Sequence, residues 1–453
     1  MKILIAGNGK VGETLAAELS GSSYDLTLID NDSSVLSDIT GKLDVMTIQG
    51  NCASMSTLVE AGVAQADLLI AATGSDEVNL LCCMTAHKLN PRLHTIARIR
   101  NPEYTEQAYA MRDAFALSMT FNPERQTAIE IERLLKFPAF LKRDSFAKGR
   151  VEIVELKIDE KSKLCNISLP DMYGIVKCKV LVCAVLRNGV CITPDGSFTI
   201  EAGDRIFVTA PTDNLATLLK NLGLVTRRIK RVLLAGGGTV SYYLAASLLR
   251  HHIQVQILEK DERRCRQLAE LLPEADIIQG DAGDRRALDS ERFASCDALV
   301  ALTGLDEMNV ILSLWGNSCG IPAVITKLGR MENAALIDTL PVGSVVSPRK
   351  LCCGTIVRYV RAMQNQAGAA LTIHTIADGQ AEAIEFPVDE NTLHCGEPLK
   401  KLKTRKNVLV ACITRGGDVS IPNGDSSFSV GDRVVVVVSG GELLLHLNDI
   451  FEE

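Results

Sequence analysis

Two short glycine-rich segments carry the residue types that bind dinucleotides. The first is Gly7-Asn8-Gly9-Lys10-Val11-Gly12 and the second is Gly236-Gly237-Gly238-Thr239-Val240-Ser241. Each follows a short apolar run, residues 3–6 or 232–235, and precedes an apolar helical pattern. A glycine turn between a strand and a helix lets backbone N–H groups approach a pyrophosphate at the positive end of the helix. The sequence therefore predicts two nucleotide sites in one chain.

An acidic residue follows each glycine segment where a ribose contact is expected. Asp30 and Glu259 each end the second predicted strand of their copy, the strand that follows the glycine segment. A carboxylate at this position accepts hydrogen bonds from ribose hydroxyls and disfavours a 2′-phosphate, so NAD(H) is favoured over NADP(H). The alternative is that the glycines only make a tight turn and that Asp30 caps a loop.

Further polar residues end the next strands on the same predicted sheet edge. Thr73 and Gly74 close the fourth strand, Arg98 closes the fifth, and Thr303 and Lys327 take the places of Thr73 and Arg98 in the second half. Ligands bind at the carboxyl edge of such sheets, so we expect Thr73, Gly74 and Arg98 to face the nucleotide, and Thr303 to do so in the second site. Arg98 has two interpretations, a contact with adenine or phosphate and a plain salt bridge.

Asp76, Glu77 and Asn79 begin the helix that follows Thr73 and Gly74. Acids at this position either contact the ligand or interact with the positive end of the helix dipole.

The second site departs from the first. Ser241 replaces the third glycine, Glu259 is one methylene longer than Asp30, and Arg263 and Arg264 follow closely and could accept a phosphate. The second segment is thus either a nucleotide site or a degenerate copy kept for its fold.

These landmarks recur in register over the whole chain. Gly7 and Gly236 lie 229 residues apart, as do Asp30 and Glu259. A Gly-Asp-Arg motif at residues 203–205 returns at residues 431–433. The chain therefore consists of two copies of one unit, each about half of its 453 residues.

Each copy divides into two kinds of structure. In the first, strand patterns alternate with helical ones, at residues 2–6, 26–29, 45–49, 67–73, 94–99 and 117–121. This alternation predicts an α/β fold with a Rossmann-like, doubly wound parallel sheet. A helix then begins at Asn122-Pro123, or at Ser347-Pro348 in copy two, where proline suits the first helical position.

Beyond that helix the apolar period changes to two, and Asn188-Gly189 predicts a hairpin turn. Each sheet is therefore followed by a small β-rich α+β subdomain. The expected divisions are a first Rossmann-like lobe, a crossover or hinge helix, a first C-terminal lobe, a second Rossmann-like lobe, a second crossover helix and a second C-terminal lobe, at residues 1–121, 122–144, 145–226, 227–346, 347–367 and 368–453.

Composition excludes several function classes. The net charge of −7 gives no electrostatic footprint for nucleic acid. No apolar run approaches the roughly 18 residues that a membrane helix needs, and the N-terminus does not resemble a signal peptide, so we expect a cytoplasmic protein. The 14 cysteines are expected to be buried and reduced, with Cys52 as an exposed exception. Neither a metal site nor a catalytic residue is predicted.

With these motifs present twice, the chain resembles the TrkA family of bacterial Trk potassium-uptake systems, whose members contain two tandem RCK (KTN) units. The resemblance covers the whole length. It implies a regulatory, non-enzymatic protein that binds NAD(H) and adenine nucleotides such as ATP and ADP. It also implies a ring of assembled units, attached peripherally to the inner face of the cell membrane through a TrkH-type potassium channel subunit.

The family's dinucleotide contacts carry over to matching positions in both copies: Gly7, Gly9, Gly12, Asp30, Thr73 and Arg98, and Gly236, Gly238, Glu259 and Thr303. One departure is that copy one has Gly50-Asn51-Cys52 where copy two has the family's Gly280-Asp281-Ala282. The loss of that carboxylate would change the ligand or phosphate state that the first site prefers.

Two other functions fit the sequence less well. An NAD-dependent dehydrogenase needs a general acid or base beside the nicotinamide, and the β-rich regions share no His, Lys or Tyr candidate. A transcriptional redox sensor needs a DNA-binding module, but the sequence has no helix-turn-helix pattern outside the repeats. A regulatory nucleotide-binding protein is therefore favoured.

Overall fold

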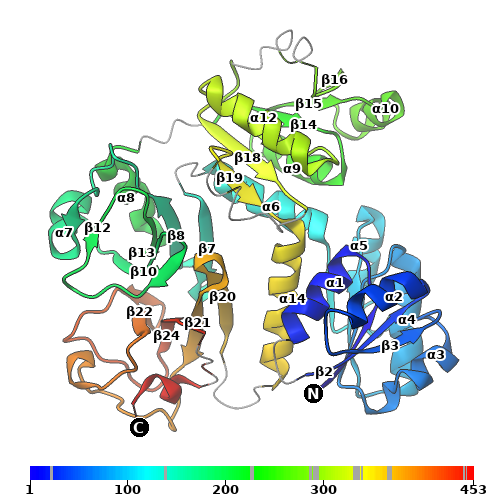
Figure 1. Ribbon diagram of the computed structural model, residues 1–453, viewed down its shortest axis with the longest axis horizontal. Coiled ribbons are helices and arrows are strands. Elements are labelled where there is room, and N and C mark those ends of the chain that lie inside the picture. Colours follow the sequence, from blue (N-terminus) through cyan, green and yellow to red (C-terminus); the bar gives the residue numbers. More distant parts are fainter. Residues whose placement is uncertain are drawn as a thin grey trace.

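The computed structural model describes the chain except for residues 21–23, 137–139, 225–228, 285–287, 289–294, 330–336, 338–339, 365–369, 442–443, 445 and 453. Two open parallel sheets and two five-stranded antiparallel sheets are arranged around the crossover helices (Figure 1).

The first sheet has the strand order β3-β2-β1-β4-β5-β6, with every pair parallel. Its strands are β1 (Lys2–Ala6), β2 (Asp25–Asp30), β3 (Met46–Gln49), β4 (Leu68–Ala71), β5 (His94–Arg98) and β6 (Met119–Phe121). The connecting helices are α1 (Lys10–Ser20), α2 (Ser33–Thr40), α3 (Met55–Glu60), α4 (Asp76–Leu89) and α5 (Pro102–Ala110). This order is that of a dinucleotide-binding fold, so the predicted doubly wound sheet is confirmed.

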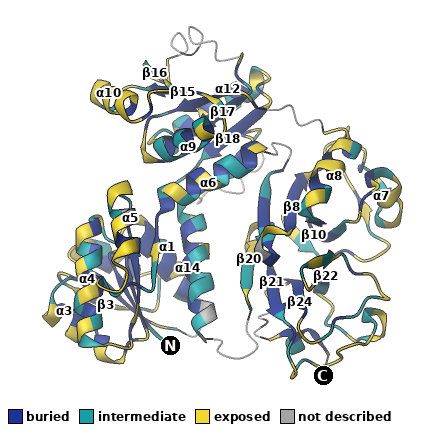
Figure 2. Cartoon of the chain, turned by 180° about the vertical axis from the view of Figure 1, so that it is seen from behind, coloured by how far each residue is buried: buried dark blue, intermediate teal, exposed yellow. Residues whose placement is uncertain are grey.

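The second sheet repeats the first in the order β16-β15-β14-β17-β18-β19. Its strands are β14 (Arg231–Ala235), β15 (Gln254–Glu259), β16 (Asp276–Gln279), β17 (Ala298–Ala301), β18 (Ala323–Lys327) and β19 (Ser344–Val346). Its helices include α9 (Thr239–Arg250), α10 (Glu262–Leu271) and α12 (Asp306–Ser318). The central strands of both sheets are short, apolar and buried on both faces, and more exposed helices lie outside them (Figure 2).

The two crossover helices are exchanged between the copies. Helix α6 (Pro123–Lys136) belongs to copy one, yet its Ile131 and Leu134 lie in the apolar core of the second parallel sheet. Helix α14 (Pro348–Gln364) belongs to copy two, and its Cys353 and Ile356 lie in the core of the first sheet, beside α1 (Figure 1). The two N-terminal lobes are therefore interlocked.

The first antiparallel sheet has the order β11-β10-β13-β8-β7. It contains β7 (Lys142–Phe146), β8 (Val151–Lys157), β10 (Leu181–Arg187), β11 (Val190–Ile192) and β13 (Arg205–Pro211), and it is accompanied by the small pair β9 (Ile167–Ser168) and β12 (Thr199–Ile200) and by helices α7 (Leu169–Val176) and α8 (Leu215–Leu222). Asn188 and Gly189 have φ values of 52° and 78°, so the predicted tight hairpin between β10 and β11 is confirmed.

The second antiparallel sheet has the order β20-β21-β24-β22-β23. It contains β20 (Thr372–Ile376), β21 (Ala381–Pro387), β22 (Val408–Arg415), β23 (Asp418–Ser420) and β24 (Arg433–Ser439). In the described part of this lobe, short 3₁₀ segments at η6 (Leu399–Lys401) and η7 (Leu447–Ile450) accompany the sheet.

The two C-terminal lobes share one apolar core, to which Phe207 of copy one and Val435 of copy two both belong. Polar contacts border this core. Arg205 pairs with Asp378 at 2.6 Å, and the Arg150 guanidinium donates to the Gly417 carbonyl at 2.8 Å. The copies are thus joined at both ends, through exchanged helices and through paired sheets.

Candidate functional site

The first glycine loop connects β1 to α1, and its three motif glycines have different surroundings. Gly7 has a φ of 94°, and a Cβ there would lie 2.8 Å from the Thr73 backbone nitrogen. A Cβ at Gly12 would collide with the Gly7 carbonyl oxygen. By contrast, a Cβ at Gly9 would meet nothing within 4 Å. The fold itself requires Gly7 and Gly12, whereas Gly9 leaves open space where a phosphate could approach.

Open space recurs at corresponding places in both copies. Gly74, just after β4, is as uncovered as Gly9, and Gly238 and Gly304 have the same property in copy two. Helix α9 has Gly238 as its N-cap, with no side-chain cap hydrogen bond. Backbone N–H groups at such a helix start can bind an anion.

The Asp30 carboxylate holds the first glycine loop. It accepts a hydrogen bond from the Asn8 N–H at 2.6 Å and another from the Asp32 N–H at 3.0 Å. Glu259 makes the equivalent bonds in copy two, to the Gly237 N–H at 2.6 Å and the Asp261 N–H at 2.8 Å. The extra methylene of Glu259 is thus accommodated without loss of the contact. Both carboxylates therefore cap their loops, which is the alternative that the sequence left open for Asp30. Each carboxylate still has lone pairs that can accept a hydrogen bond from a ribose hydroxyl.

Thr73 is fixed by a neighbour whose role the sequence did not indicate. Asn79 is fully buried, and its Oδ1 accepts from the Thr73 N–H at 2.8 Å while its Nδ2 donates to the Arg98 carbonyl at 2.9 Å. Asn309 ties Thr303 to Lys327 in the same way. The asparagine therefore joins two strand ends, and its recurrence at equal spacing was the available signal.

Arg98 forms the salt bridge that was one of its two interpretations. Its Nη2 lies 3.1 Å from Glu124 Oε1, at the start of α6. Asp76 is buried and accepts from the Arg100 and Asn101 N–H groups, both at 2.8 Å. The Asp76 carboxylate thus holds the turn after β5. Glu77 accepts from the Ser75 hydroxyl, which lowers the pKa of Glu77.

The second loop is shaped by its own side chains. The Ser241 hydroxyl donates to the Gly236 carbonyl, so the residue that replaces the third glycine is absorbed by a local hydrogen bond. The Arg264 Nε donates to the Gly237 carbonyl at 2.8 Å. Lys10, Val11, Thr239 and Val240 lie at the starts of α1 and α9, as their motif positions predicted. Arg264 places a cation against the second loop where copy one has Val35.

Residues near the two candidate sites interact across the contact between the copies. Burial lowers the pKa of Lys327, with a further lowering from Lys10 of copy one and opposing effects from Asp306 and Glu124. The Tyr243 hydroxyl on α9 donates to the Arg100 carbonyl of copy one at 3.0 Å. Residues beside each nucleotide loop therefore contact the other copy.

The prediction that Cys52 is an exposed thiol is wrong. Its exposed fraction is 6%, and it lies in one apolar cluster with Cys82 and Cys83. A hydrogen bond with the Cys82 thiol lowers the pKa of Cys52, whereas that bond and burial raise the pKa of Cys82. The loop after β3 folds inward, and loop position in a sequence does not indicate this.

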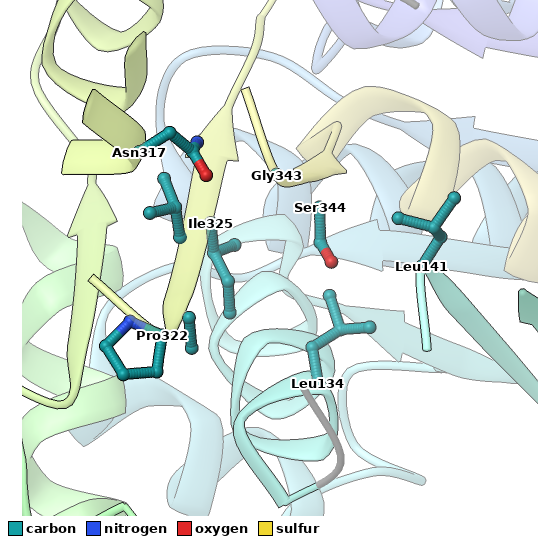
Figure 3. Close-up of a pocket in the computed structure, with 9 residues that line it drawn as sticks. Leu134, Leu141, Asn317, Pro322, Ile325, Gly343 and Ser344 are labelled. Carbon is teal, nitrogen blue, oxygen red and sulfur yellow. The ribbon is translucent and has the colours of Figure 1, made fainter. Parts of the chain in front are cut away.

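A cavity of about 100 Å³ lies between the exchanged helix α6 and the second parallel sheet (Figure 3). Leu134 of α6, Ile325 of β18 and Ser344 of β19 line it, with Asn317 at one side. The cavity is therefore a packing feature of the exchanged helix rather than part of a nucleotide site.

Comparisons with known proteins agree with this architecture. The TrkA-N domain model matches residues 3–117 and 232–348, and the TrkA-C domain model matches residues 153–223 and 383–445. A Trk system potassium uptake protein TrkA homolog of Archaeoglobus fulgidus is 32% identical over 443 residues, covering 98% of each chain. TrkA of Haemophilus influenzae is 31% identical over 460 residues, covering 100% of this chain and 99% of its own.

Solved structures show the same fold. The crystal structure of the GsuK RCK domain superposes with a TM-score of 0.62 at 15% identity, over 97% of this chain and 92% of that one. The GsuK channel bound to NAD gives a TM-score of 0.62 at 16% identity, over 97% of this chain and 76% of that one.

Fold and loops together define a tandem RCK protein, in which two Rossmann-like lobes each precede a β-rich lobe. The chain belongs to the TrkA family of Trk system potassium uptake proteins.

Proposed function

We propose that this protein is a nucleotide-sensing regulatory subunit that binds NAD(H), together with ATP or ADP, and gates a TrkH-type potassium channel subunit. One observation carries the proposal. Each copy presents an uncovered glycine at a helix start, Gly9 or Gly238, beside a carboxylate anchored to the same loop. Family membership supplies the context of potassium uptake.

The ligand assignment rests on these loops and on similar proteins. The GsuK channel, which has the same fold, has been solved bound to NAD and, in a second structure, to ADP. In this chain, the proposed contacts are the loop backbones at residues 7–12 and 236–240, with Asp30 and Glu259 at the ribose. Thr73, Gly74, Arg98 and Thr303 complete the proposed sites, and Arg98 would leave Glu124 to reach a phosphate.

Ligand binding can reach the other copy through existing contacts. The Tyr243 hydroxyl joins α9 to Arg100, and the Ser247 hydroxyl donates to Glu132 of α6 at 2.6 Å. A ligand at the start of α9 that favours one position of this helix would therefore bias α6 as well. Such a bias requires different ligand affinities in the two positions.

The proposed divisions of the chain are those expected from its sequence, with lobes at 1–121, 145–226, 227–346 and 368–453. The proposed assembly is a ring of RCK units. Leu81 on α4 and Ile311 on α12 occupy equivalent places in the copies and are 52% and 59% exposed. Apolar side chains at both outer faces suit contacts between successive chains.

We also propose peripheral attachment to the membrane through the partner subunit. Among the described residues, no helix combines the length and apolar character needed to cross a membrane. A dehydrogenase remains the alternative function. It would consume NADH in the presence of a substrate, whereas a sensor releases the nucleotide unchanged.

The test is potassium flux through liposomes that contain the TrkH-type subunit, with this protein added outside. Flux should change with NADH or ATP, and Gly9→Val together with Gly238→Val should abolish that response while the protein still binds the channel. Flux that is unaffected by the protein at every nucleotide concentration would contradict the proposal.

A further inference from the structure

A cleft lies at the edge of the second parallel sheet that is opposite its glycine loop. The strand β14 begins at Arg231 and enters the glycine loop after Ala235, so the start of β14 is the far edge of the sheet. The cleft there has a volume of about 330 Å³ and is lined by Ile229, Lys230, Arg231, His251, His252, Ile253 and Gln254. It is therefore separate from both candidate nucleotide sites.

The cleft is basic in an acidic protein. Four of its seven lining residues are Lys230, Arg231, His251 and His252, all of them exposed, and none of the seven is acidic. The whole chain carries a net charge of −7. Clustered cations with a rigid backbone attract anions, phosphate in particular.

An acid beside the cleft, Asp297, already has backbone partners. Asp297 accepts from the backbone N–H groups of Lys230 at 2.9 Å and Arg231 at 3.0 Å. The Arg231 Nη2 donates to the Ser295 carbonyl at 2.7 Å, which holds the guanidinium at the rim. Asp297 and Ser295 thus fix the cationic segment in place.

The fold does not require three of these four side chains, because copy one keeps a cation only at the place of Arg231. In copy one the positions that correspond to Lys230, Arg231, His251 and His252, each 229 residues earlier, are Met1, Lys2, Ser22 and Ser23. His252 has a φ of 57°, the left-handed conformation that commonly ends a helix, here α9. The presence of Lys230, His251 and His252 in one copy and their absence from the other point to a role beyond folding.

The cleft borders the contact between the copies. His251 Nε2 lies 3.2 Å from Glu132 Oε1, on the exchanged helix α6. An anion in the cleft would therefore compete with Glu132 for His251.

From this geometry we propose that the cleft binds a phosphate group, free or on a lipid headgroup, and that binding weakens the contact between His251 and Glu132. The site is independent of nucleotide binding at the glycine loops.

The test is calorimetric titration of the full chain with pyrophosphate, in a Gly9→Val, Gly238→Val background that keeps the probe out of the glycine loops. One site is expected, and Lys230→Glu should weaken it by about tenfold or more, because a repulsive charge replaces an attractive one. Lys2→Glu, at the place in copy one that matches Arg231, is the control and should leave the affinity unchanged. Glu132→Gln should tighten binding, since it removes the competing carboxylate.

Flotation with phosphatidylcholine vesicles, with and without phosphatidylglycerol, separates the two sources of phosphate. If flotation depends on Lys230 and pyrophosphate does not bind, the ligand is a lipid headgroup. If pyrophosphate binds and this binding depends on Lys230, the ligand is a free phosphate. His252→Gly provides a second variant that keeps the left-handed turn, and it should also weaken binding. The proposal is overturned if neither probe binds, or if binding is the same in Lys230→Glu and His252→Gly as in the parent protein.

Discussion

At the residue scale, the glycines of the first nucleotide loop are of two kinds. Some are required by the fold, and one leaves space for a ligand. Gly12 is required because a side chain there would collide with Gly7, whereas the space above Gly9 is empty. Copy two differs, because Ser241 stands at the place of Gly12 and its hydroxyl donates to the Gly236 carbonyl. Substitutions at the two kinds of position should therefore have different consequences.

Gly9→Val should abolish nucleotide binding at the first site while leaving the melting temperature nearly unchanged. The added side chain enters open space and blocks the approach of a pyrophosphate to the backbone. NADH titration and thermal unfolding of the same preparation measure both effects. Gly12→Ala is the control and should lower the melting temperature. Retained affinity in Gly9→Val would mean that this loop does not face the ligand.

The sequence predicted the glycine loops and their acids, but not which side chains are buried behind them. Asp30 and Glu259 lie at the loops because strand ends in a parallel sheet are set by register. Cys52 was predicted to be exposed because it follows a strand, and it is buried because its loop folds against α4. Burial of a loop residue depends on packing partners distant in sequence.

At the element scale, the Gly-Asp-Arg motif of each C-terminal lobe is a buried junction. Asp204 is 1% exposed, and its carboxylate bonds to Arg187 on β10 at 2.8 and 2.7 Å. Asp432 is 3% exposed and bonds to Arg415 on β22 at 2.9 and 2.7 Å. The motif thus joins the turn before β13 or β24 to the adjacent strand.

Asp432 should make unfolding sensitive to acid. Burial alone would raise its pKa, but hydrogen bonds from Arg415 and from the Ser429 N–H lower the pKa below its ordinary value. A carboxyl with a lowered pKa stabilises the fold above its unfolded pKa of about 3.9, and this stability is lost as pH falls through the folded pKa.

Urea unfolding of wild type and Asp432→Asn at several pH values tests this expectation. The difference in unfolding free energy should be largest near neutral pH and should shrink below about pH 4. Asp425→Asn changes an exposed salt bridge to Lys400 and is the control. A difference that does not vary with pH would contradict the assignment.

Element types were predictable because period and turn residues are local. The strands of both parallel sheets coincide with short apolar runs, and Asn188-Gly189 marked the β10–β11 turn. The two C-terminal lobes differ in detail, since α8 is a helix whereas η7 is a 3₁₀ segment. Such a difference depends on the packing of each lobe rather than on its repeat pattern.

At the scale of the whole molecule, exchange of α6 and α14 makes each N-terminal lobe depend on the other copy. The sequence indicated where the two helices begin, but it did not specify which of two similar sheets each helix covers. Only the packing of the folded protein identifies the sheet that each helix covers. Ile131 of α6 packs in one core with β14, and Ile356 of α14 packs in one core with β1.

Ile131→Ala, a substitution in copy one, should destabilise the second N-terminal lobe. Ile131 is fully buried in that core, and truncation of such a residue costs about 2–5 kcal/mol. Hydrogen exchange should therefore accelerate in β14 and α9. Ile129→Ala on the same helix is the matched control, because Ile129 is 46% exposed and its loss should cost less than about 0.5 kcal/mol. Faster exchange confined to the first sheet would contradict the exchange of helices.

Leu81→Asp and Ile311→Asp should reduce the mass of the assembled protein in light scattering. Both side chains are exposed in one chain, and charge at an apolar contact disfavours association. Met111→Asp, at another exposed apolar side chain, is the control for a general effect of added charge. An unchanged mass in both variants would exclude α4 and α12 from the contact between chains.

The most direct test of the central claim is isothermal titration of the purified chain with NADH, NAD and ATP, in parallel with Asp30→Ala and Glu259→Ala. We expect the wild-type protein to bind, and each substitution to weaken binding at its own copy by about 1–3 kcal/mol through loss of hydrogen bonds to a charged acceptor. Selective losses would assign ligands to the two loops. Absence of binding by the wild-type protein to all three nucleotides would contradict the account and leave the two sheets as a scaffold for assembly.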